Sequence, residues 1–242
     1  MMRRALFCFI LAAAPAAAEE LAIPEISYPA LKTSAASAAA FAPAGWALEQ
    51  SVTGDLNADG ADDLVMLLRM ADPKIVLSNS GGMREDPFDS NPRILAIAFA
   101  DASGGYRLAL QNHSLIARRT EPALDDTVDG SDSLAIERGA VKVRLNFFMS
   151  AGGWTMFNAT YRFRYQNGRF ELIGFDRVTT QRNTGDLRIV SINYPAGVAK
   201  IETGTIESDI GKVTESRLPK NRKALTIEDV GDGLDFNPMP TP

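Results

Sequence analysis

The sequence predicts an all-β domain folded as an antiparallel meander, and three observations predict it. Apolar and polar residues alternate in segments from residue 94 onward, which is the period of half-buried strands. Short turns that contain glycine separate these segments, as is typical of hairpins. The connections are too short for the crossover helices that a parallel sheet needs. A barrel-like meander, a sandwich and an irregular propeller share these signals, so all three topologies remain open.

Residues 1–18 have the composition of a secretory signal peptide. Arg3 and Arg4 precede an apolar segment over residues 5–14, and three alanines at 16–18 precede Glu19. The apolar segment is shorter than the roughly 20 residues of a membrane-spanning helix. We therefore expect a periplasmic or secreted protein with no stable membrane insertion.

The expected mature chain is acidic and has no thiol. The formal net charge of the 242-residue sequence is −5, and residues 1–18 contain its single cysteine and two of its arginines. Nucleic acids and anionic membranes require clustered lysine and arginine, so the composition argues against both as partners. Because no disulfide can form, the domain must be held together by its core or by a metal ion.

Residues 19–44 are rich in alanine with scattered prolines. They are expected to form a linker or a short helix over 34–41 that ends before Pro43. Trp46 and Leu48 are expected to begin the folded part of the chain.

Residues 54–65, with the sequence GDLNADGADDLV, carry the spacing of a metal site. Four oxygen-bearing side chains and one backbone carbonyl fall at alternating loop positions, and hard cations such as calcium bind oxygen ligands in this way. The sequence therefore predicts calcium as a cofactor. The expected ligands are Asp55, Asn57, Asp59, the carbonyl of Ala61, and Asp63.

The residues around these ligands indicate a loop between strands. Gly60 follows the third ligand, where the chain must reverse, and glycine reaches the positive φ values that such a turn needs. A helix-loop-helix calcium site would have glutamate where this chain has Met66, so that type of site is not expected. Leu64–Leu68 is apolar at every position, which predicts a strand buried on both faces.

Residues 54–65 resemble the core of FG-GAP and VCBS-type repeats, whose pattern G-D-x-N-x-D-G-x-x-D-hydrophobic binds calcium between strands. The motif occurs once in full, and residues 229–235 repeat it with a different spacing. The flanking segments 41–46 and 170–176 are similar to those of uncharacterised bacterial exported proteins with a single such loop. The resemblance covers about residues 41–200. It implies a calcium-bound loop and no particular activity.

Each expected hairpin is marked by its turn. The turns are 101–105, Glu137–Gly139, Asn167–Gly168 and Pro195–Gly197. Asn-Gly favours a type I′ turn, because both residues reach positive φ. We expect the β-rich domain to cover residues 45–208. Residues 209–242 lose the alternation and gain prolines, so we expect a mobile polar tail there.

Residues 125–132 form an acidic segment between expected strands. Asp125, Asp126 and Asp129 are its candidate functional residues. Two carboxylates about 5 to 10 Å apart would suit a glycosidase-type hydrolase. A second cation site and a solvated turn with nothing bound are the other interpretations.

Trp154 follows Gly152–Gly153 and could stack on a sugar or a peptide, or fold back onto the core. His113 is the only histidine and Cys8 lies in the expected signal peptide, so zinc and histidine-dependent nucleophilic sites are not expected.

We favour an exported calcium-binding domain that serves as a structural or interaction module with a protein or glycan ligand. A carboxylate-based hydrolase that uses residues 125–132 is the alternative.

Overall fold

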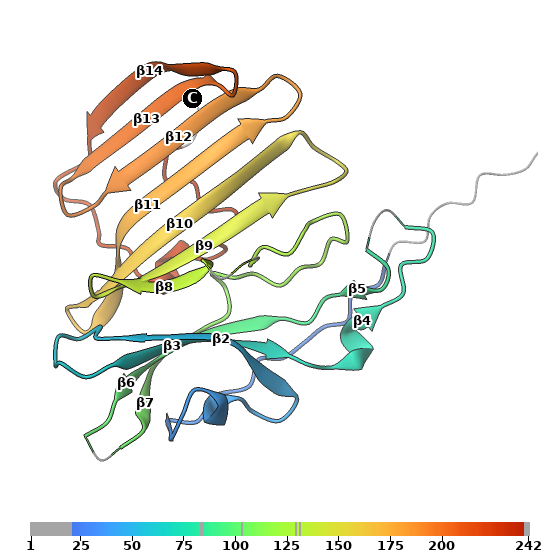
Figure 1. Ribbon diagram of the computed structural model, residues 1–242, viewed down its shortest axis with the longest axis vertical. Helices are drawn as coiled ribbons and strands as arrows, with labels where there is room; N and C mark the ends of the chain where they lie inside the picture. Colours follow the sequence, from blue (N-terminus) through green and yellow to red (C-terminus); the bar gives the residue numbers. More distant parts are fainter. Residues whose placement is uncertain (1–20, 83–84, 103, 129, 131, 240–242) are drawn as a thin grey trace, which may run out of the picture.

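Two antiparallel sheets lie against each other (Figure 1). The computed structural model describes residues 21–82, 85–102, 104–128, 130 and 132–239, and the expected signal peptide over 1–18 lies outside them. Every strand pairing in this part of the chain is antiparallel. The prediction of an all-β antiparallel meander is therefore confirmed.

The smaller sheet has five strands in the order β1-β7-β6-β3-β2. These are β1 (Ser34–Ala35), β2 (Trp46–Gly54), β3 (Asp63–Met70), β6 (Arg93–Ala100) and β7 (Tyr106–Asn112). Between β3 and β6 the chain makes the short helix η2 (Pro73–Ile75) and a separate pair of strands, β4 (Val76–Leu77) and β5 (Phe88–Asp89).

The larger sheet has seven strands, and each pairs with its neighbour in the sequence. They are β8 (Leu134–Glu137), β9 (Ala140–Phe148), β10 (Thr155–Gln166), β11 (Arg169–Gln181), β12 (Asp186–Asn193), β13 (Val198–Thr205) and β14 (Ser208–Arg217). Asn167 (φ 54°) and Gly168 (φ 76°) form the turn between β10 and β11. Their positive φ values are those that the sequence predicted for a type I′ turn.

The strand β3 is buried on both faces, as predicted. Val65 and Leu67 pack in the core between the two sheets. Leu64, Met66 and Leu68 point the other way, into a second core. A strand in this position has no solvated face, and Leu64–Leu68 is apolar at every position for that reason.

The segment before β2 belongs to the domain and is not a free linker. The expected helix over 34–41 is reduced to one turn, η1 (Ala39–Phe41), because Ser34–Ala35 pairs with β7 as β1. Leu31 and Phe41 are buried against the outer face of the smaller sheet. The segment supplies the apolar cover that the second face of β3 requires.

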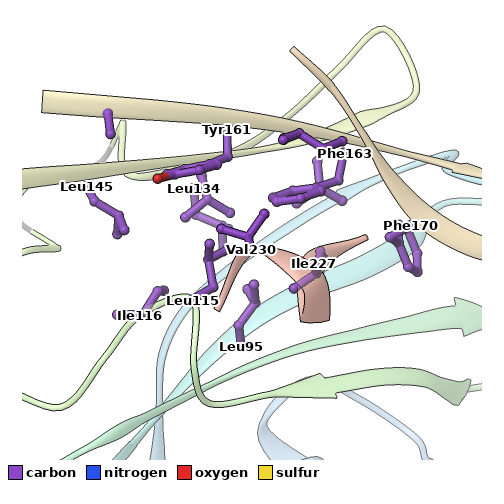
Figure 2. Packing of buried hydrophobic residues seen from close by; sticks show 14 of the residues in the cluster. Leu95, Leu115, Ile116, Leu134, Leu145, Tyr161, Phe163, Phe170, Ile227 and Val230 are labelled. Atoms are coloured by element: carbon purple, nitrogen blue, oxygen red, sulfur yellow. The ribbon is translucent and has the colours of Figure 1, made fainter. Parts of the chain in front are cut away.

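The predicted mobile tail is wrong for residues 209–239. The chain continues β14 as far as Arg217 and then returns to the space between the sheets. There the helix α1 (Ile227–Val230) buries Ile227 and Val230. Figure 2 shows Ile227 and Val230 between the Tyr161 and Phe163 side chains of β10 and the Leu95 and Leu115 side chains on the other side. Residues 218–239 lack strand alternation because most of them have no regular secondary structure. They nevertheless contribute side chains to the core.

Two further contacts fix this C-terminal segment. The buried Tyr161 hydroxyl donates a hydrogen bond to the Gly233 carbonyl at 2.5 Å. A Cβ atom on Gly233 would lie 2.5 Å from Leu145 Cδ1 and 2.7 Å from the Leu115 carbonyl oxygen, so only glycine allows this close approach. Among the helices of the described residues, none is long and apolar enough to span a bilayer.

Candidate functional site

The candidate calcium loop joins β2 to β3. Two of its residues have left-handed backbone conformations, Ala58 with φ 64° and Gly60 with φ 86°, and together they reverse the chain. A Cβ on Gly60 would meet nothing within 4 Å. The backbone conformation, rather than a lack of space, is therefore what favours glycine at this position.

The candidate ligand side chains turn inward and accept hydrogen bonds from the loop itself. The two carboxylate oxygens of Asp55 accept from the backbone N–H groups of Ala58 at 2.7 Å and Gly60 at 3.0 Å. Asp59 Oδ1 accepts from Ala61 N–H at 2.8 Å. Asn57 Oδ1 accepts from Asp59 N–H, and its Nδ2 donates to Asp59 Oδ2, both at 2.9 Å. These bonds hold the loop in one conformation.

Asp63 is the fully buried member of the set. Its oxygens accept from the backbone N–H groups of Leu56 and Ala100, each at 2.9 Å, so it ties the loop to the end of β6. Burial raises the pKa of Asp63, the two backbone hydrogen bonds lower it, and the charges of Asp59 and Asp55 raise it, with a net increase. Ionisation of Asp63 beside two other carboxylates is therefore unfavourable without a cation.

The chemistry of this loop fits a calcium ion, because all the candidate ligand atoms are oxygens. Within the described part of the chain, Asp55, Asp59 and Asp63 make no ion pair with lysine or arginine. As the side chains stand, no group of three or more His, Cys, Asp or Glu residues among those described is placed to hold a metal ion. A carboxylate oxygen has two lone pairs, so it can accept an amide hydrogen and bind a cation together.

The loop also lies against the larger sheet. A Cβ on Gly54 would lie 3.0 Å from Ile136 Cγ2 of β8, and one on Gly139 would lie 3.6 Å from the Asp55 carbonyl oxygen. In Figure 1 the β2–β3 loop and the β8–β9 turn lie at the same edge of the molecule. The conformation of the loop is thus coupled to the junction between the two sheets.

The described carboxylates Asp126 and Asp132 of the acidic segment 125–132 are each paired with an arginine, Asp126 with Arg93 and Asp132 with Arg144. Asp126 accepts hydrogen bonds from both terminal nitrogens of Arg93, at 2.8 and 2.7 Å. Burial raises the pKa of Asp126, but the hydrogen bonds and charge of Arg93 outweigh it and the net pKa is lowered. Asp125 donates its backbone N–H to the Phe148 carbonyl at 3.0 Å. Asp129 lies outside the described residues.

Arg93 is the residue that the sequence analysis missed here. It is 7% exposed, and it also binds Glu49 with Nε and Nη2 at 2.6 and 2.7 Å. One arginine therefore joins β2, β6 and the acidic segment. A single arginine immediately before the apolar strand 94–99 was the signal in the sequence, since charged residues are rarely buried unless they are paired.

Trp154 is exposed rather than folded onto the core, with 62% of its surface accessible. The Arg182 guanidinium lies 5.9 Å from the Trp154 ring centroid and 4.5 Å from that of Phe148. Arg182 Nη2 also donates to the carbonyls of Met149 and Gly153, both at 2.6 Å. The arginine therefore fixes the loop that presents the indole ring.

A groove of about 860 Å³ lies on the outer face of the larger sheet. It is lined by Arg162, Arg164, Gly174, Asp176 and Ser191, among others. Arg162 pairs with Asp176, which also accepts from the Ser191 hydroxyl at 2.5 Å. Sequence analysis did not identify this groove, because cross-strand neighbours from three hairpins form it.

His113 lies in a structural position. Its ring stacks on Tyr28 with the centroids 4.1 Å apart, so it helps to hold the N-terminal segment on the smaller sheet.

No protein-family model, curated protein or solved structure matches the chain. Function is therefore inferred from the residues and contacts of this chain itself.

Proposed function

We propose that the protein is an exported calcium-binding β-domain that works as a structural or interaction module. One observation carries the proposal: Asp55, Asn57, Asp59, Ala61 and Asp63 lie in a single closed turn whose carboxylates have no cationic partner among the described residues. The resemblance of residues 54–65 to FG-GAP and VCBS-type calcium loops supports it. The signal-peptide composition of residues 1–18 supports the proposal that the protein is exported.

In this proposal the ion has a structural role. It would neutralise the repulsion among Asp55, Asp59 and the buried Asp63, and so hold the loop in its closed form. Because Asp55 lies against the turn at Gly139, a rigid loop would also stabilise the junction of the two sheets. Calcium sites in extracellular modules function even with dissociation constants of about 10⁻⁴ to 10⁻³ M.

Calcium is expected to raise the melting temperature of the purified protein. Binding at a hundredfold excess over Kd contributes about 2.7 kcal/mol, which corresponds to a shift of roughly 5 to 10 °C for a domain of this size. The measurement is a thermal melt in millimolar calcium, in excess chelator and in magnesium. Equal melting temperatures in calcium and chelator, with no calcium found by elemental analysis, would contradict the proposal.

Variants of the same loop provide the matched control. Asp55→Asn combined with Asp59→Asn should remove most of the calcium-dependent shift. Asp62→Asn changes the charge of the same loop at an exposed position that is not a candidate ligand, so it should keep the shift. If the double variant loses as much stability in chelator as in calcium, the two aspartates act through the loop hydrogen bonds alone.

The outer face of the larger sheet is the proposed ligand surface. Trp154 and the partly exposed Met156 lie at one end of β10, and Arg162, on the same face of the strand as Met156, lines the groove at the other end. An exposed aromatic ring and a polar groove on one face of the sheet suit an extended glycan or peptide that reaches both, because the ring stacks while polar groups bind hydroxyl or amide groups.

Trp154→Ala is expected to reduce ligand retention without destabilising the fold. The side chain is exposed, so its loss should change the free energy of unfolding by less than about 0.5 kcal/mol. The measurement is retention on cellulose and chitin matrices together with a denaturant titration, with Trp46→Phe as the aromatic control on the other sheet. Equal retention of wild type and Trp154→Ala on a matrix that binds the wild type would remove Trp154 from the ligand surface.

No contact that the structure describes in residues 125–132 favours the alternative of a carboxylate-based hydrolase. Asp126 is held by Arg93, and a lowered pKa is unsuited to a general acid. We therefore do not propose catalysis by residues 125–132.

A further inference from the structure

A second pocket, of about 400 Å³, opens on the core-facing side of the larger sheet. Thr179, Arg188 and Thr203 pair across β11, β12 and β13, so their side chains share one face. Arg177 precedes Thr179 by two residues and lies on the same face. All four line the pocket, together with Asn237 of the C-terminal segment and with Asp186, whose carboxylate accepts a hydrogen bond from the Thr184 hydroxyl at 2.6 Å. Figure 1 shows that these strands extend beyond the smaller sheet, which leaves this end of the face uncovered by it.

The two arginines of this pocket are held in place by few contacts. The Arg177 guanidinium carbon lies 3.6 Å from the Phe157 ring centroid, and its Nη1 donates to the Phe236 carbonyl at 3.4 Å. Arg188 Nη2 donates to the Met239 carbonyl at 2.7 Å. A guanidinium has five N–H donors, so each arginine is oriented and retains most of its donors for another group.

Their positive charges lack a direct partner in the described residues. Neither Arg177 nor Arg188 lies within ion-pair distance of a carboxylate there. Burial lowers the pKa of Arg177, and the charge of Arg188 lowers it too, whereas Tyr161 and Asp235 raise it, with a net decrease. Two half-buried like charges on one face are unfavourable alone, and an anion between them would relieve the repulsion.

We propose that this pocket binds a small organic oxyanion, with Arg177 and Arg188 as the residues that grip its carboxylate, phosphate or sulfate group. Arginine suits this role because its planar fork matches the geometry of oxyanions. Thr179, Thr203 and Asn237 would contact the rest of the ligand through hydroxyl and amide groups. The volume lies near the lower end of the roughly 300 to 1,000 Å³ of ligand pockets, which suits a ligand the size of a sugar acid. The proposal is independent of the calcium loop.

The test uses the purified protein in chelator, so the state of the calcium loop does not affect it. Glucuronate, inorganic phosphate and glucose are titrated at constant ionic strength, and backbone amide resonances are followed by NMR. Glucuronate should shift resonances of β11, β12 and β13, whereas glucose at the same concentration should not. A response to phosphate that exceeds the response to glucuronate would identify the phosphate group as the preferred oxyanion.

Arg188→Gln should raise the dissociation constant by at least about tenfold, because hydrogen bonds between charged partners are lost. Arg107→Gln is the matched control, since it makes the same charge change at an exposed position of β7 in the smaller sheet, outside both proposed binding surfaces, and should bind as the wild type does. If Arg188→Gln loosens the C-terminal segment, Arg188→Lys keeps the charge without the planar fork, and Thr203→Val removes one hydroxyl. Both should weaken binding.

Three results would overturn the proposal. The first is the absence of any response of β11 to β13 to glucuronate and phosphate. The second is equal affinity of the wild type and a folded Arg188 variant. The third is equal weakening by Arg188→Gln and Arg107→Gln, which would indicate a general charge effect.

Discussion

Replacing Ile227 with alanine is expected to lower the free energy of unfolding by about 2 to 5 kcal/mol, the usual cost of truncating a large buried aliphatic side chain. Ile227 has no exposed surface, and α1 lies between the sheets among side chains of both (Figure 2). The space left by the side chain would be closed on several sides, so little relaxation can fill it. A denaturant titration followed by circular dichroism measures the change.

The adjacent Glu228 provides the control for this experiment. It lies on the same short helix and is exposed, so Glu228→Ala should change the free energy of unfolding by less than about 0.5 kcal/mol. If both substitutions had equally small effects, residues 218–239 would behave as a tail and not as part of the core.

Replacing Arg93 with methionine is expected to cost about 2 to 3 kcal/mol, because a buried arginine loses its charged hydrogen bonds while its two carboxylate partners keep part of their solvation. Arg93 makes four hydrogen bonds of 2.6 to 2.8 Å to Glu49 and Asp126. Methionine would replace the stem of the side chain and leave Glu49 and Asp126 with only the longer contacts of Arg69 Nη1, at 3.5 and 3.9 Å. Adding Glu49→Gln and Asp126→Asn to Arg93→Met should recover part of the loss.

The pH dependence of this effect follows from the lowered pKa of Asp126. A carboxyl whose folded pKa is depressed stabilises the protein above its unfolded pKa of about 4, and this contribution is lost as pH falls through the folded pKa. In Arg93→Met, Asp126 loses its nearest cation, so the folded pKa of Asp126 rises and its protonation relieves the repulsion from Glu49. The stability difference between wild type and variant should therefore narrow as pH falls from 7 towards 4.

Arg144→Met is the matched control for the Arg93 experiments. Arg144 pairs with Asp132 at 2.9 Å, but both side chains are substantially exposed, and exposed pairs contribute about 0 to 1 kcal/mol. Two results would contradict a special role for the Arg93 ion pairs. One is an equal loss in the free energy of unfolding in Arg93→Met and Arg144→Met. The other is a difference in the free energy of unfolding between wild type and Arg93→Met that does not change with pH.

The sequence by itself determined the features that depend on neighbours in the chain. Alternation over β10 predicted a half-buried strand, and Asn167–Gly168 predicted the turn that joins it to β11, because side-chain direction in a strand and positive φ in a turn are local properties. The uniformly apolar segment Leu64–Leu68 predicted burial of β3 on both faces. The spacing of Asp55, Asn57 and Asp59 predicted a single turn that gathers oxygen atoms, since all three lie within one short loop.

Tertiary structure alone decided which segments fill the space between and around the two sheets. Residues 218–239 and 28–42 have no strand period, yet they bury Ile227 and Phe41, because the sheets leave apolar faces that some part of the chain must cover. The pairing of Arg93 with Glu49 and Asp126, and the juxtaposition of Arg177 with Arg188, likewise depend on which strands become neighbours. Such contacts join residues far apart in the sequence or on different strands, and local periodicity carries no information about them.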